Sequence, residues 1–159
     1  MSLLAAGDQA PDITARRRDG STLTLASLKG RHVLVYFYPK DDTPGCTAEA
    51  CGLNDNLTAL TQTGADVIGV STDSWESHAR FAQKYGLEFG LASDADSSIR
   101  KAYGVGKMLG ILPAVQRVSF LVGPDGRIVH VWPRVNATRH PTEVLEEVRQ
   151  RSSAQTVTG

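Results

Sequence analysis

The stretch "HVLVYFYPKDDTPGC", residues 32–46, contains the two patterns that decide the fold of this chain. Its first part (32–38) is a nearly continuous apolar run, rich in β-branched and aromatic side chains, which is typical of a strand buried on both faces of a sheet. The last four residues (43–46) have the features of a helix start, because threonine is a good N-cap and proline suits the first helical position. The stretch therefore predicts a central strand that leads through a short turn into a helix.

Strand and helix patterns continue on both sides of this stretch. Alternating polar and apolar residues around Asp19-Gly20 predict a hairpin over 12–25. A second buried strand is predicted over 65–71. Two further strands are predicted over 117–132 and are joined at Pro124-Asp125-Gly126. One helix is predicted from the end of the opening stretch to Gly64, and three more are predicted over 74–86, 94–104 and 141–151.

The order of these elements predicts an α/β protein with a mixed central sheet, helices on both faces and an N-terminal hairpin. A length of 159 residues suits one domain. Because no repeat or linker interrupts the chain, we expect a single domain over residues 1–159, in which 152–159 form a frayed tail.

The composition excludes several classes of partner. Lysine plus arginine equals aspartate plus glutamate at 17 each, so no net charge attracts the protein to nucleic acid or to an anionic membrane. No apolar run is long enough to span a bilayer, and the N-terminus lacks the features of a signal peptide. We therefore expect a cytoplasmic protein without a nucleic-acid or membrane partner.

Both cysteines of the chain lie in the helix that follows the opening stretch. Cys46 is placed in its first turn, where free backbone N–H groups and the positive end of the helix dipole favour a thiolate over a thiol. A thiolate is the nucleophilic form of cysteine. The alternative interpretation is that Cys46 is a small buried apolar side chain, but its position at a helix start favours reactivity.

Cys51 follows five positions later in the same predicted helix. On a regular helix the two residues are separated by about 140° around the axis and about 7.5 Å along it, beyond the roughly 7 Å between Cα atoms that a disulfide spans. The pair can bridge only if the start of the helix unwinds, and Gly52 weakens the helix there. A metal site is not expected, since this spacing is not a two-cysteine clamp and the four scattered histidines do not complete one.

The sequence around the cysteines resembles a known family. Pro39, Thr43 and Cys46 have the spacing of the peroxiredoxin active-site signature, and "FYPKDDTPGCTAEACGLND" is similar to the peroxiredoxin Q (bacterioferritin comigratory protein) subfamily. The segments over 67–96 and 117–129 are also similar to that subfamily. The resemblance implies a thioredoxin-like fold and thiol-dependent reduction of hydrogen peroxide and organic hydroperoxides.

The resemblance also implies a role for each residue that matches the motif. Cys46 would be the peroxidatic cysteine, whose thiolate attacks a peroxide oxygen and becomes a sulfenic acid. Cys51 would be the resolving cysteine that captures this sulfenic acid as an intramolecular disulfide. Thr43 would hydrogen-bond the thiolate and the peroxide, Arg117 would stabilise their negative charge, and Pro39 would shield the thiolate and shape the pocket.

The same resemblance implies that thioredoxin or a similar dithiol protein reduces the disulfide, so that no bound cofactor is needed. We expect a monomer or a weak homodimer. An alternative function is a redox-sensing or chaperone-like protein that uses the same disulfide as a switch. A thiol–disulfide oxidoreductase is disfavoured, because its two cysteines would be separated by two residues.

Other polar side chains near the motif receive no role from the sequence. The acidic residues Asp41, Asp42 and Glu49 are expected to be solvated. His78 lies near the polar face of the helix predicted over 74–86 and is expected to be structural.

Overall fold

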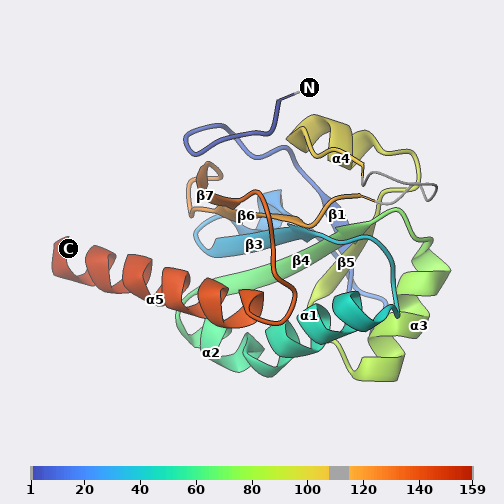
Figure 1. The fold of residues 1–159 in the computed structure, drawn as a ribbon. Helices are drawn as coiled ribbons and strands as arrows, with labels where there is room; N and C mark the ends of the chain where they lie inside the picture. Colours follow the sequence, from blue (N-terminus) through green and yellow to red (C-terminus); the bar gives the residue numbers. More distant parts are fainter. Residues whose placement is uncertain (1, 108–114, 159) are drawn as a thin grey trace.

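The structure is a computed structural model, and it describes residues 2–107 and 115–158 (Figure 1). Within these residues seven strands form one mixed sheet, in the order β2-β1-β5-β4-β3-β6-β7. The strands are β1 (Thr14–Arg16), β2 (Thr22–Thr24), β3 (His32–Phe37), β4 (Ala65–Ser71), β5 (Gly90–Ser93), β6 (Val118–Val122) and β7 (Ile128–Trp132). The helices are α1 (Pro44–Asp55), α2 (Leu57–Gln62), α3 (Trp75–Tyr85), α4 (Ser98–Tyr103) and α5 (His140–Thr158), with a short 3-10 helix at Ala26–Leu28.

β3 is the centre of the sheet, as its apolar sequence predicts. It pairs in parallel with β4 and antiparallel with β6, and all six of its side chains are buried. Alternate side chains of β3 enter two different cores, because successive residues of a strand point to opposite faces. Val33, Val35 and Phe37 pack on the face that also includes Tyr103 of α4, whereas Leu34 and Tyr36 pack on the face of the other helices.

Helices cover both faces of the sheet, which confirms the predicted architecture. α1, α2, α3 and α5 lie on one face, and α4 lies on the other with the N-terminal segment (Figure 1). The N-terminal hairpin is also confirmed, since β1 pairs antiparallel with β2. None of the helices described in residues 2–107 and 115–158 is both long enough and apolar enough to cross a membrane.

Three features of the fold differ from the sequence prediction. The helix predicted up to Gly64 is divided at Asn56 into α1 and α2. β5 was not predicted, because a four-residue strand that begins with glycine gives little pattern. α5 continues to Thr158, beyond the predicted end of the helix at residue 151, and no glycine or proline occurs over residues 142–158 to end it.

Candidate active site

Cys46 lies in the first turn of α1, immediately beyond the carboxyl end of β3. Thr43 is the N-cap and Pro44 is the first helical residue, so the sequence prediction of a helix start is confirmed. The carbonyl oxygen of Thr43 accepts the N–H of Thr47 at 2.8 Å, which begins the helical hydrogen bonds after the cysteine. Cys46 is buried, with 1% of its surface exposed. Its sulfur is shielded from bulk water and lies at the positive end of a helix, where backbone N–H groups point toward a developing negative charge.

Arg117 brings a positive charge to this sulfur. Its Nη2 donates a hydrogen bond to Cys46 Sγ at 3.1 Å, and its Nη1 donates to Glu49 Oε1 at 3.0 Å. Arg117 comes just before β6, whose first residue Val118 pairs with Phe37 at the end of β3. This antiparallel register is what brings residues 71 positions apart into contact.

Gly45 makes the approach of Arg117 possible. A Cβ atom at position 45 would lie 2.7 Å from Arg117 Nη2, closer than side-chain atoms normally approach. The absence of a side chain therefore leaves space for the guanidinium group beside Cys46. The glycine in "TPGC" has a packing function that the sequence motif alone did not reveal.

Glu49 is fully buried, so the expectation that it is solvated was wrong. Burial raises the pKa of its carboxyl group from 4.5 to about 7, although the charge and the hydrogen bond of Arg117 oppose the rise. Among the described residues Glu49 Oε2 has no hydrogen-bond partner, which also favours a protonated carboxyl group. One signal was present in the sequence: Glu49 follows Cys46 by three positions, and residues at that spacing share a helix face.

Thr43 and Pro39 lie in the turn that connects β3 to α1. Thr43 occupies the N-cap position, but its hydroxyl group makes no capping hydrogen bond to the helix. It donates instead to the carbonyl oxygen of Lys40 at 2.9 Å. Within the described part of the chain this hydroxyl has no hydrogen bond to Cys46. Pro39 is half-buried in the same turn. The structure thus brings Arg117 into contact with the cysteine and places Thr43 and Pro39 on the segment that leads to it.

Cys51 is also a free thiol, half-buried on the same uninterrupted helix as Cys46. Burial, and secondarily the carboxylate of Asp55, raise the pKa of the Cys51 thiol, so it remains protonated at neutral pH while α1 is folded. The next residue, Gly52, packs closely against α5: a Cβ atom there would lie 2.6 Å from Pro141 Cγ. Gly52 therefore allows α1 and α5 to approach one another, in addition to lowering helix propensity.

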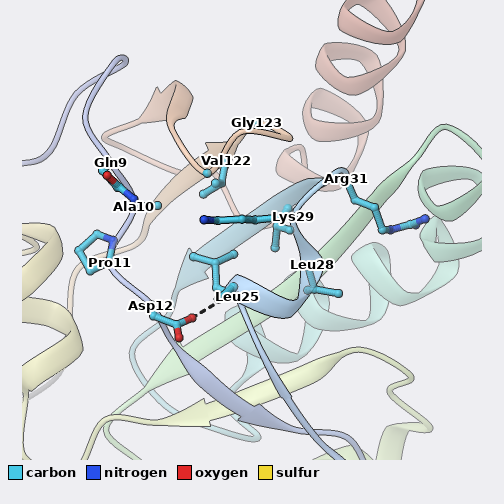
Figure 2. A pocket seen from close by; sticks show the side chains of 13 residues that line it. Gln9, Ala10, Pro11, Asp12, Leu25, Leu28, Lys29, Arg31, Val122 and Gly123 are labelled. Atoms are coloured by element: carbon cyan, nitrogen blue, oxygen red, sulfur yellow. Dashed lines mark hydrogen bonds between the residues drawn. The ribbon is translucent and has the colours of Figure 1, made fainter.

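A hollow elsewhere on the surface is not part of this site. It is lined by Lys29, Arg31 and Val33 at the amino end of β3, and Figure 2 shows the Lys29 side chain extending across it. Cys46 follows the opposite, carboxyl end of the same strand. The hollow therefore lies away from the sulfur of Cys46.

The chain is similar to known proteins in both sequence and structure. A family model described as AhpC/TSA family matches residues 6–131. The chain is 40% identical over 156 residues to the peroxiredoxin Bcp of Escherichia coli, with 96% of this chain and 100% of the relative covered. A crystal structure of a cysteine-to-serine mutant of PrxQ from Xylella fastidiosa has a TM-score of 0.86 at 32% identity, covering 96% of this chain and 99% of that one. A structure of the bacterioferritin comigratory protein of Xanthomonas campestris, described for its alkyl peroxide reduction activity, has a TM-score of 0.78 at 33% identity and covers 88% of this chain and 92% of that one.

Proposed function

Because this chain belongs to the AhpC/TSA family and is a thiol-dependent peroxidase with a thioredoxin-like fold, we propose that Cys46 is the residue that reacts with the peroxide. The observation that carries this proposal is the 3.1 Å hydrogen bond from Arg117 to a cysteine sulfur in the first turn of a helix. Two independent sources of positive potential, the helix end and the guanidinium group, meet at that sulfur.

In the first chemical step the thiolate of Cys46 attacks one oxygen of the peroxide. The S–O bond forms as the O–O bond breaks, so the sulfur is oxidised to a sulfenic acid. The departing oxygen takes up a proton and leaves as water or as an alcohol. Arg117 stabilises the negative charge that moves from sulfur to the departing oxygen. In this proposal the peroxide binds beside Cys46, next to the turn between β3 and α1 that contains Thr43 and Pro39.

Cys51 resolves the sulfenic acid in the second step. Its sulfur attacks the sulfur of Cys46, a disulfide forms, and the sulfenic oxygen leaves as water. Both residues lie five positions apart in α1, so the first turns of the helix must unwind before the two sulfurs meet. Burial raises the pKa of the Cys51 thiol while α1 is folded, so its thiolate fraction is lower then than after the helix opens.

A dithiol protein of the thioredoxin type then reduces the disulfide and returns both cysteines to thiols. Unwinding of α1 also exposes the disulfide to such a partner, which must reach one sulfur atom to attack it. The substrates we propose are hydrogen peroxide and organic hydroperoxides. The Xanthomonas campestris relative, described for alkyl peroxide reduction, supports the organic class.

Steady-state peroxide consumption tests this proposal. The protein is supplied with thioredoxin, thioredoxin reductase and NADPH, and hydrogen peroxide and cumene hydroperoxide are compared as substrates. We expect many turnovers per protein molecule with either peroxide, and none from Cys46→Ser. Consumption of a single equivalent, even with the reducing system present, would contradict the proposed cycle and would instead fit a redox switch.

A further inference from the structure

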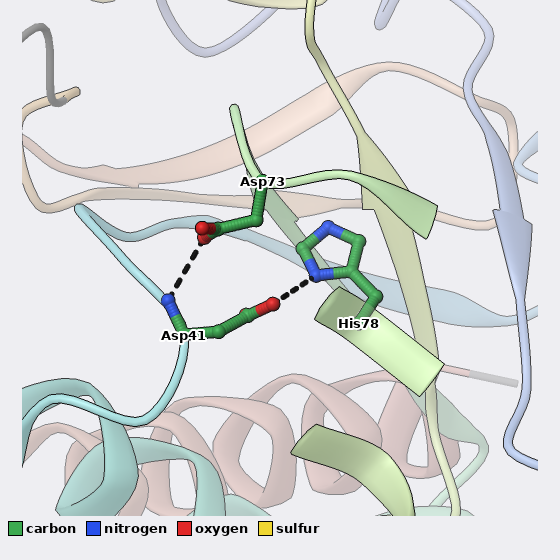
Figure 3. Close-up of side chains that lie close together, drawn as sticks. All are labelled: Asp41, Asp73 and His78. Carbon is green, nitrogen blue, oxygen red and sulfur yellow. Dashed lines mark hydrogen bonds and ion pairs between the residues drawn. The ribbon is translucent and has the colours of Figure 1, made fainter. Parts of the chain in front are cut away.

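A buried polar network anchors the turn between β3 and α1 outside the cysteine site. Its centre is Asp41, which is buried although the sequence suggested a solvated side chain. The Asp41 carboxylate accepts hydrogen bonds from the hydroxyl of Tyr38 at 2.5 Å and the hydroxyl of Ser77 at 2.8 Å. It also contacts His78 Nδ1 at 2.7 Å (Figure 3). Ser77 and His78 belong to α3, so Asp41 attaches the turn to that helix.

His78 connects this network to the sheet. Its Nε2 lies 2.9 Å from the carbonyl oxygen of Ala92 in β5. A carbonyl oxygen only accepts, so Nε2 carries a proton, and a second proton lies between Nδ1 and Asp41 Oδ2. Every polar atom of the buried histidine therefore has a partner, as buried polar groups require.

The cluster is not suited to a metal ion, although potential ligand atoms of Asp41, Asp73 and His78 lie within 4.8 Å of one another. Asp73 Oδ2 accepts the N–H of Asp41 at 2.8 Å and the hydroxyl of Ser71 at 2.6 Å. Both nitrogens of His78 are engaged as well. Protein donors thus occupy the positions that a cation would need, and the cluster holds the turn in place (Figure 3).

The neighbouring residue strengthens the attachment from the solvent side. Asp42 has a φ of 58°, in the left-handed region that is unfavourable for a residue other than glycine. Its carboxylate accepts hydrogen bonds from Lys84 Nζ at 2.8 Å and from the Tyr85 hydroxyl at 2.6 Å, both at the end of α3. Two consecutive aspartates therefore hold the turn against both ends of this helix.

We propose that Asp41 and His78 are positioning residues of the peroxidase reaction. Their buried pair fixes the turn over 39–43 on α3, and this turn continues directly into the first turn of α1. The pair thereby favours the folded α1, in which Cys46 contacts Arg117 and reacts with peroxide. It opposes the unwinding that disulfide formation needs, so this inference rests on the proposed resolution by Cys51.

The test compares two rates in Asp41→Ala, Asp41→Asn and the wild type. The first is the reaction of reduced Cys46 with peroxide, and the second is disulfide formation after one equivalent of peroxide, followed by quenched mass analysis. In Asp41→Ala we expect the first rate to fall and the second to rise, each by about fivefold or more. Asp41→Asn should restore much of both, because its amide can accept from Tyr38 and donate to a neutral His78.

Asp94 provides a matched control. It is a buried aspartate whose carboxylate accepts the N–H groups of Ile99 and Arg100 at 2.9 and 2.8 Å and, among the described residues, makes no hydrogen bond to the turn over 39–43. Asp94→Ala should lower the melting temperature and leave the ratio of the two rates unchanged. If Asp41 had only a structural role, Asp41→Ala would behave like Asp94→Ala: the melting temperature would fall and the ratio of the two rates would not change.

The outcomes separate this inference from the proposed function. If Asp41→Ala does not fold, His78→Gln is measured in its place, with the same opposite changes expected. Two rates that fall together, or that do not change while the wild type forms the disulfide, would overturn the positioning role. A wild type that forms no disulfide between Cys46 and Cys51 would overturn the proposed function instead.

Discussion

The guanidinium group of Arg117 has two acceptors, Cys46 Sγ and Glu49 Oε1, and its charge acts on both. The raised pKa of Glu49, about 7, places its titration in the neutral range. A protonated Glu49 leaves the charge of Arg117 to the thiolate, whereas an ionised Glu49 competes for it. The reactivity of Cys46 is therefore linked to a carboxyl group one helical turn further along α1.

The contact between Gly45 and Arg117 predicts a defect in reactivity with little loss of stability. A methyl group at position 45 would displace Arg117 Nη2, which is the far end of a flexible side chain and can move away. In Gly45→Ala we expect the reaction of Cys46 with peroxide to slow by about tenfold or more, since a charged donor is lost. Competition kinetics against a second peroxidase measure this rate. Ala48→Ser, at an exposed position of the same helix, is the control and should react at the wild-type rate.

The burial of Glu49 predicts a stability difference that depends on pH. Its pKa is raised in the folded protein, so the folded form binds the extra proton between pH 4.5 and about 7. The stabilisation is therefore fully present below pH 4.5 and is lost as the pH rises to about 7; a shift of this size corresponds to roughly 3 kcal/mol.

Urea unfolding of the wild type and Glu49→Gln at pH 5 and pH 8 measures this difference. Glutamine does not titrate, so the wild type should lose stability relative to the variant as the pH rises. A difference between the two proteins that is the same at both pH values would show that Glu49 does not titrate in this range.

At the scale of the secondary-structure elements, the two ends of α1 are held by different parts of the fold. Its first turn depends on Arg117 and on the turn that precedes it. Its last turns pack against α5, where Gly52 touches Pro141 and Asn56 Nδ2 donates to the Pro141 carbonyl oxygen at 3.3 Å. Opening that starts at the amino end can therefore reach the cysteines while the contact with α5 stays in place.

The close packing of α1 on α5 predicts that Gly52→Ala is destabilising. The added methyl group would overlap the Pro141 ring, and overpacking of this kind costs about 1–3 kcal/mol. Urea unfolding measures the loss. Pro141→Ala removes the opposing atoms, so the double variant should recover part of the stability that Gly52→Ala loses. Two effects that simply add would mean that the packing contact does not limit residue 52.

Elements with local signals were predictable from the sequence, whereas those that depend on distant partners were not. α3 is capped at its start by Ser74, whose hydroxyl accepts the N–H of Ser77 at 3.1 Å, and at its end by Gly86, which has a φ of 62°. β5, in contrast, is stabilised as a strand by its pairing with β4 and β1, which its own sequence does not reveal. The break at Asn56 coincides with the contact to Pro141, which lies 85 positions away.

At the scale of the whole molecule, the sheet assembles the site from segments far apart in the chain. The resemblance to the peroxiredoxin motif pointed to Cys46 and Arg117, and the structure places the two in contact. The burial of Asp41 and Glu49 was missed, because it results from the way α3 and the strands enclose the start of α1. Charged side chains are mostly exposed, so the sequence alone predicts that a charged residue beside a motif is solvated; its burial becomes apparent only when its tertiary neighbours are known.

Unwinding on oxidation predicts a local change in amide hydrogen exchange. Protection over residues 44–51 should fall when the disulfide forms, because the two cysteines cannot meet on an intact helix. Protection of β3 and β4 should persist, since both strands are buried in the centre of the sheet. Equal protection of 44–51 in the reduced and oxidised proteins, with the disulfide confirmed by mass, would contradict the unwinding.

The identity of the oxidised residue after a single equivalent of peroxide tests the central claim most directly. The wild type and Cys51→Ser are each treated with one equivalent, a sulfenic-acid probe is added, and the peptides are analysed by mass spectrometry. We predict a disulfide between Cys46 and Cys51 in the wild type, and in Cys51→Ser a labelled sulfenic acid on Cys46 that forms at nearly the wild-type rate. A wild type whose label is on Cys51, or a Cys51→Ser protein that consumes no peroxide, would contradict the assignment of Cys46 as the residue that reacts with peroxide.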